Sequence, residues 1–243
     1  VAVIGNGIEG DNILIGCKTG EYLETGTNNI FIGSGAGTNT TSSMNNIVIG
    51  AFAMNIGNSS DVIIIGKEAG LNNNSNGNIF IGSNAGINNI NGMFNIFIGL
   101  NAGYQNVDSS NNVIIGIDAG RALIGNGTDG DNILIGSNSG KSLITGTNNI
   151  YVGSGSGSTS TTSINNVVIG SNTLREGNSN KIITIGNNAG INNNADGNIF
   201  IGSNVGINNT IGINNIFIGL NAGKSNTIST DNVMIGKNSG RAF

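Results

Sequence analysis

The chain has 243 residues, of which 42 are Gly, and it contains no Pro, Trp or His and a single Cys. The usual metal sites, imidazole bases and disulfide frameworks therefore lack their residues, so we expect neither an enzyme nor a cofactor. A formal net charge of −4 with 9% charged residues offers no basic stripe to a nucleic acid. No apolar run approaches the roughly 20 residues that cross a bilayer, so we expect no direct membrane insertion.

A short phrase close to Asn-Ile-x-Ile-Gly recurs along the whole chain. Its final glycine returns at a nearly constant spacing, apart from one longer gap between Gly116 and Gly136, and the second half repeats the first at an offset of 120. A period of about 16–17 residues is too short for a helical hairpin or a propeller unit and suits one coil of a β-solenoid. We predict an all-β parallel solenoid (β-roll) of about 14 coils, built as two seven-coil blocks (1–120 and 121–243) in one continuous rod.

Each coil contains a short apolar strand. One column of β-branched residues begins at Ile13 and a second begins two residues later at Ile15, so both face the same way. Branched side chains suit a pleated sheet, and we expect these columns to stack as the core of the coils. The second column is Ile15, Ile32, Ile49, Ile65, Ile81, Ile98, Ile115, Ile135, Val152, Ile169, Ile185, Ile201, Ile218 and Ile235.

The residue between these two columns should point to the opposite face, yet it is apolar in most coils, with Thr184 as the exception. An apolar stripe on the outside of a soluble protein marks an interface, so we expect other copies of the chain to cover it, three around a common axis. A second strand of the same chain covering the stripe is the alternative. The inter-subunit candidates are Leu14, Phe31, Phe80, Phe97, Tyr151, Phe200 and Phe217.

An Asn precedes the strand in most coils. Stacked amides can donate to and accept from one another, and we interpret the column as a structural ladder. Its members are Asn12, Asn29, Asn46, Asn78, Asn95, Asn112, Asn132, Asn149, Asn166, Asn198, Asn215 and Asn232. One coil in each block differs, because Met54 and Leu174 replace a turn glycine. We predict a local distortion there, with a ligand-binding surface as the alternative.

The phrases at 46–50 and 166–170 resemble the Asn-Ser-Val-Ala-Ile-Gly repeats of trimeric autotransporter adhesin heads, the YadA-like left-handed parallel β-rolls. Similar repeats also look like those of phage tail fibres and viral fibre proteins. The resemblance covers nearly the whole chain. It implies a homotrimeric, extracellular roll at a cell or virion surface, with a host-surface protein, a matrix protein or a glycan as partner.

Three functions remain open at this point. Cell adhesion by a rigid fibre segment is the reading that the resemblance implies, and a purely structural filament or coat component assembling end to end is the alternative. Ice or crystal-surface binding would need a regular outward array of Thr, which 38–43 and 158–163 do not continue into neighbouring coils. The chain begins at Val1, and 241–243 aligns with 121–123, so we expect a fragment of a longer repeat protein.

Overall fold

The computed structural model describes residues 2–7, 10–125 and 130–240. Short β-strands and turns make up these residues, with no helix among them. The chain divides into two compact units, Val1–Asp129 and Gly130–Phe243, which are described separately here. The division falls slightly beyond the predicted block boundary at Gly120. The predicted alignment of 241–243 lies outside the described residues.

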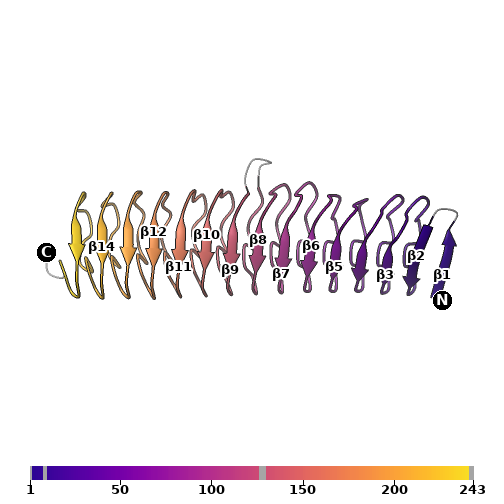
Figure 1. The fold of residues 1–243 in the computed structure, drawn as a ribbon, viewed down its shortest axis with the longest axis horizontal. Helices are drawn as coiled ribbons and strands as arrows, with labels where there is room; N and C mark the ends of the chain where they lie inside the picture. Colours follow the sequence, from indigo (N-terminus) through magenta and orange to yellow (C-terminus); the bar gives the residue numbers. More distant parts are fainter. Residues whose placement is uncertain (1, 8–9, 126–129, 241–243) are drawn as a thin grey trace. The chain divides into compact units, whose positions relative to one another are not determined.

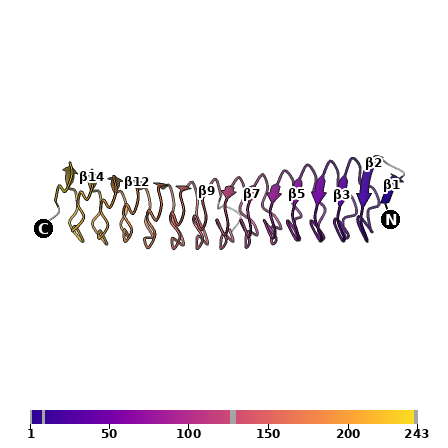
Figure 2. The same cartoon turned by 90° about the horizontal axis from the view of Figure 1, so that it is seen from below.

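The first unit is a parallel β-solenoid preceded by one antiparallel strand. Strand β1 (Ala2–Gly7) pairs antiparallel with β2 (Gly10–Ile15), whereas β2 to β8 are parallel neighbours in chain order (Figures 1 and 2). The remaining strands are β3 (Ile30–Ile32), β4 (Ile47–Ile49), β5 (Ile63–Ile65), β6 (Ile79–Ile81), β7 (Ile96–Ile98) and β8 (Val113–Ile115).

The second unit is a solenoid of parallel strands. Each pairs with the next in chain order (Figure 1). They are β9 (Ile133–Ile135), β10 (Ile150–Val152), β11 (Val167–Ile169), β12 (Ile183–Ile185), β13 (Ile199–Ile201), β14 (Ile216–Ile218) and β15 (Val233–Ile235). The predicted fold class is therefore confirmed: one repeat of the sequence is one coil, and each coil contributes one strand.

The strand register follows the sequence repeat. Ile47 lies opposite Ile30 of the preceding coil and opposite Ile63 of the following coil. These two spacings along the chain differ by one position, so the turns absorb the difference in coil length. Identical positions of successive coils therefore stack along the sheet, as the columns predicted. In parallel pairing the chain must return to its starting side before the next strand begins. The residues between successive strands, which form most of each repeat, make this return.

The two faces of the strand are the reverse of the predicted ones. The expected core column is half-buried or exposed, with exposed fractions of 44% at Ile15 and 66% at Ile235. This correction applies to Ile15, Ile32, Ile49, Ile65, Ile81, Ile98, Ile115, Ile135, Val152, Ile169, Ile185, Ile201, Ile218 and Ile235. The expected inter-subunit residues lie inside the coil instead: Phe31, Phe80, Phe97, Tyr151, Phe200 and Phe217 are fully buried in the single chain, and Leu14 is half-buried.

The narrow interior of the coil explains this assignment. Along one strand Asn29 points inward, Ile30 outward, Phe31 inward and Ile32 outward, which is the period of two that a strand imposes. In most coils a glycine lies opposite the middle strand residue, and its missing side chain leaves room for one large strand side chain. A Cβ atom on Gly37 would lie 2.5 Å from the ring of Phe31.

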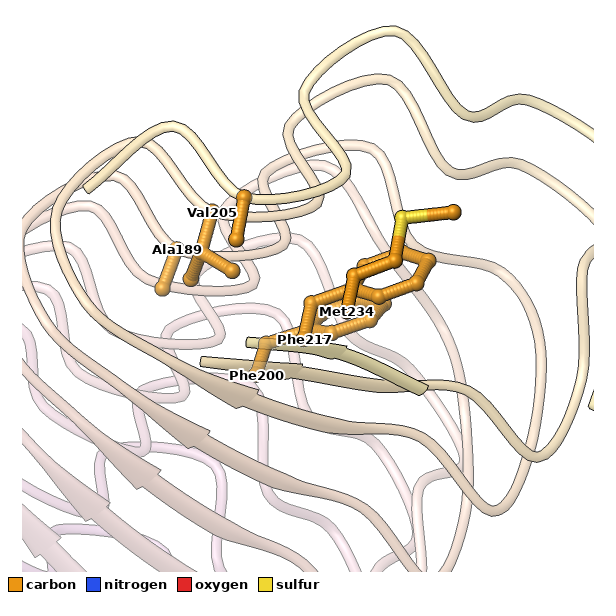
Figure 3. Close-up of a cluster of buried hydrophobic side chains, with 6 residues drawn as sticks. Ala189, Phe200, Val205, Phe217 and Met234 are labelled. Carbon is orange, nitrogen blue, oxygen red and sulfur yellow. The ribbon is translucent and has the colours of Figure 1, made fainter. Parts of the chain in front are cut away.

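Aromatic rings stack along the axis inside each unit. The rings of Phe80 and Phe97 lie 4.9 Å apart and 12° from parallel in the first unit. Phe200 and Phe217 lie 5.1 Å apart in the second, where Met234 continues the column (Figure 3). Burial of each such side chain contributes on the order of 1.5–3 kcal/mol, so this inner column stabilises each unit at every coil.

The Met54 and Leu174 coils keep the common backbone. Both residues are fully buried and adopt the left-handed conformation of the glycines they replace, with φ of 42° and 49°. These two coils hold Val48 and Val168 at the inner strand position, where most other coils hold Leu, Ile, Met or an aromatic residue, so a larger corner side chain accompanies a smaller strand side chain. The predicted distortion is absent from the strand pairing, since both coils remain in register with their neighbours.

Replacing Thr184 by Val is expected to stabilise the second unit. Thr184 is fully buried in the inner column, and its hydroxyl oxygen has no hydrogen-bond partner. A buried hydroxyl without a partner costs about 1–3 kcal/mol, and Val has the same shape without that group. Thermal unfolding followed by circular dichroism should show a higher Tm for Thr184→Val and a lower one for Thr184→Ala, which leaves a cavity. An unchanged or lower Tm for the Val variant would contradict this.

Candidate interaction surface

The outward side chains of the strands form an unbroken aliphatic surface along each unit, which we call the outer aliphatic face. It consists of Ile13 and Ile15 of β2 and of the first and third residues of each later strand. The first-column members are Ile13, Ile30, Ile47, Ile63, Ile79, Ile96 and Val113 in one unit, and Ile133, Ile150, Val167, Ile183, Ile199, Ile216 and Val233 in the other. Every position of both columns is Ile or Val.

These side chains are partly covered by one another and otherwise open. Within the first column, 41% of Ile13 and 36% of Ile133 are exposed, and Val233 at the end of the second unit reaches 67%. Single exposed aliphatic residues are ordinary on protein surfaces, whereas a contiguous patch that passes every strand of a unit is typical of an interaction surface. Charged residues are absent from both columns, so nothing in them opposes burial against another apolar surface.

The predicted Asn ladder is present on the inner face. Asn29 Nδ2 donates to Asn12 Oδ1 at 3.0 Å, and Asn46 Nδ2 donates to Asn29 Oδ1 at 2.9 Å. The same pattern joins Asn149 to Asn132 at 3.0 Å in the second unit. Val62 and Ile182 interrupt the ladder, but Oδ1 of Asn46 and of Asn166 still accepts their backbone N–H, as Asn12 Oδ1 accepts the backbone N–H of Asn29. These amides satisfy buried backbone groups, which supports the structural interpretation.

A second buried ladder was not predicted from the sequence. Asn89 Nδ2 donates to Asn73 Oδ1 at 2.7 Å, and Asn106 Nδ2 donates to Asn89 Oδ1 at 2.6 Å. Asn193, Asn209 and Asn226 repeat this in the second unit. Their common position, shortly after the corner glycine of each coil, was the available signal. Both ladders lie inside the coil and take no part in the outer surface.

No match to this chain is found among protein-family models, curated proteins or solved structures. In the described parts of the chain, no three His, Cys, Asp or Glu residues are grouped as metal ligands would be, and no helix could cross a membrane. Cys17 is exposed and is not in a disulfide. Exposed ion pairs, such as Lys18–Glu21 at 3.8 Å, contribute little to stability. The outer aliphatic face is the candidate functional surface because it is a contiguous apolar patch along each unit.

Proposed function

We propose that the chain is a non-enzymatic segment of an extracellular fibre, whose copies assemble side by side through the outer aliphatic face. The observation that carries this proposal is the pair of Ile and Val columns on a sheet face that the single chain leaves partly exposed in every coil. Hydrophobic burial is roughly proportional to area, and every coil adds the same two side chains. The driving force for association therefore grows with the number of coils.

Three copies around a common axis is the arrangement that the resemblance to adhesin heads implies. In it each chain turns its aliphatic face inward and its polar turns outward. Closed cyclic symmetry of this kind limits growth, because no aliphatic face is left unpaired. Because the strand faces are reversed, the residues at the interface between copies also differ from the predicted ones. Ile32 and Ile98 would contact the partner copies, and Phe31 and Phe97 would stay within their own coils.

Attachment to a host surface, a matrix protein or a glycan is the activity we propose for the assembled fibre, at a cell or virion surface. The similarity to adhesin repeats and the repeated polar turns outside the sheet support it. End-to-end filament growth is the competing assembly. The two differ in how mass depends on concentration, because a closed trimer has one mass and a filament has no fixed one.

Light scattering of the whole chain tests the assembly. We expect a discrete particle of three times 24.5 kDa. The double variant Ile49→Lys/Ile81→Lys should be monomeric with an unchanged circular dichroism spectrum, because it places uncompensated charge in the apolar interface. The matched control, Ile56→Lys/Ile90→Lys, changes exposed residues outside the face and should keep the wild-type mass.

Other results would overturn parts of the proposal. A monomeric wild type at micromolar concentration, or a face variant with wild-type mass, would remove the side-by-side interface. A mass that rises steadily with concentration would favour the filament. Attachment is tested separately, by binding of the labelled assembly to immobilised matrix proteins and to a glycan array.

A further inference from the structure

A polar cavity opens at the corners of three successive coils in the second unit. Its volume is about 450 Å³, and its walls come from the turns that follow β9, β10 and β11. Backbone hydrogen bonds hold these turns together: the Ser142 N–H donates to the Ser158 carbonyl at 3.1 Å, and the Thr159 N–H donates to the Arg175 carbonyl at 3.2 Å. The cavity is thus built on the ladder of the solenoid itself.

The side chains that line the cavity are polar or charged, and the charged ones are positive. Lys141 and Arg175 supply two cations, and Ser142, Ser158 and Thr159 supply hydroxyls. No carboxylate lines the cavity, although the chain as a whole has a net charge of −4. No aliphatic or aromatic side chain lines it, so the cavity favours a polar ligand over an apolar one.

The first block has the same repeat pattern but different residues at the positions equivalent to the cavity lining. The positive charge of the lining is therefore not required by the fold. Lys141 replaces Glu21 of the first block, which is paired with Lys18 at 3.8 Å, and Arg175 replaces Asn55. Asn172 replaces Phe52, whose ring lies 2.7 Å from where a Cβ on Gly35 would be. At the corresponding positions the first block therefore has an acidic residue, a neutral amide and an aromatic residue in place of Lys141, Arg175 and Asn172.

We infer that this cavity binds an anionic oligosaccharide, with Lys141 and Arg175 contacting its sulfate or carboxylate groups and the hydroxyl and amide side chains contacting its ring hydroxyls. This deepens the proposed attachment function, on which it rests, by giving its ligand class. A cavity of this volume is within the range of ordinary ligand sites. Arg can bind an oxyanion through two parallel hydrogen bonds, and its charge persists at every physiological pH.

Isothermal titration calorimetry of the whole chain tests this with three hexasaccharides: sulfated heparin fragments, carboxylated hyaluronan and neutral chitin fragments. We expect the wild type to bind at least one anionic ligand and not the neutral one, with weaker binding at higher salt. The double variant Lys141→Gln/Arg175→Gln should lose at least about tenfold in affinity, as expected for lost charge-assisted hydrogen bonds. Comparison of the two anionic arms shows which charged group is recognised.

Two further variants make the test specific to the cavity. Asn172→Phe restores the first block's residue at a position where Phe52 already adopts the same left-handed backbone, with φ of 56° against 52°, and it should block binding. The matched control Lys224→Gln/Lys237→Gln removes two charges elsewhere in the same unit and should stay within about twofold of wild type. No binding of either anionic ligand, equal binding of the neutral ligand, or an equal loss in the control would overturn the inference.

The inference and the proposed assembly fail in different ways. All cavity variants should keep the wild-type mass in light scattering, because Lys141, Asn172 and Arg175 lie outside the outer aliphatic face. A trimer that binds no anionic oligosaccharide would refute only the cavity assignment. A monomer that binds one would refute only the assembly.

Discussion

Replacing Gly99 by Ala should lower the free energy of unfolding of the first unit by about 3–5 kcal/mol. Gly99 follows β7 with a φ of +134°, a region that residues with a side chain rarely adopt. The added Cβ would lie 2.5 Å from the carbonyl oxygen of Gly116 in the next coil. Backbone strain and a backbone clash therefore act together, and denaturant unfolding followed by circular dichroism measures the loss.

Gly236 provides a matched control for this prediction. It occupies the same place after β15 and has a φ of +118°, but a Cβ there would have no heavy atom within 4 Å. Gly236→Ala should thus lower the free energy of unfolding only through backbone strain, by about 1–2 kcal/mol. Equal losses in the two variants would show that coil-to-coil contact has no part in the requirement for glycine.

Replacing Phe97 by Ala should destabilise the first unit by about 3–5 kcal/mol, the usual cost of removing a buried aromatic ring. Phe97 is fully buried, stacks on Phe80 at 4.9 Å and fills the space above Gly103. The cavity left behind cannot collapse easily, because stacked coils hold its walls apart. Thermal and denaturant unfolding of the variant should both show the loss at low protein concentration, where assembly does not contribute.

Phe94 is the control for this second prediction, since it is the same residue type in the same coil. It is 61% exposed and has a φ of 57°. Phe94→Ala should therefore change stability by less than about 1 kcal/mol. Ile98→Ala should fall between the two, because its side chain is half-buried. A larger loss for Ile98→Ala than for Phe97→Ala would contradict the corrected assignment of the strand faces.

The fold could be predicted from the sequence because one short period repeats throughout. The nearly constant spacing between glycines such as Gly33, Gly50 and Gly66 determines both the coil length and the strand register. Parallel stacking follows, since equivalent residues can lie beside one another only if each repeat makes one full coil. The antiparallel strand β1 was not predicted, because residues 2–7 lack the Asn-Ile-x-Ile-Gly phrase that identifies the other strands.

The faces of the strand were assigned wrongly because both are apolar. Alternation of polar and apolar residues normally identifies the buried face, and Ile47-Val48-Ile49 contains no such contrast. The deciding signal was Asn46, because it lies two residues before Val48 and must share its face. A ladder of amides that stack inside the coil therefore requires the middle residue to lie inside as well.

The polar cavity could not be predicted from the sequence alone. Its walls come from residues such as Ser142, Ser158 and Arg175, which are one repeat apart along the chain and meet only because coils stack. Comparing the two blocks position by position would have revealed the exchange of Glu21 for Lys141. That comparison gives the change of charge, but the concave shape depends on the turn conformations.

The strand pairing of each unit also determines how such a protein can change in length. Each strand inside a unit exchanges hydrogen bonds only with the strands one coil before and after it, as Ile63 pairs with Ile47 and Ile79. Insertion or loss of one whole coil would therefore leave every other pairing intact. The segments 78–82 and 198–202 are identical and lie 120 residues apart, so insertion or loss of a whole 120-residue block would preserve the repeat in the same way. Both kinds of change would yield proteins of different reach with the same architecture.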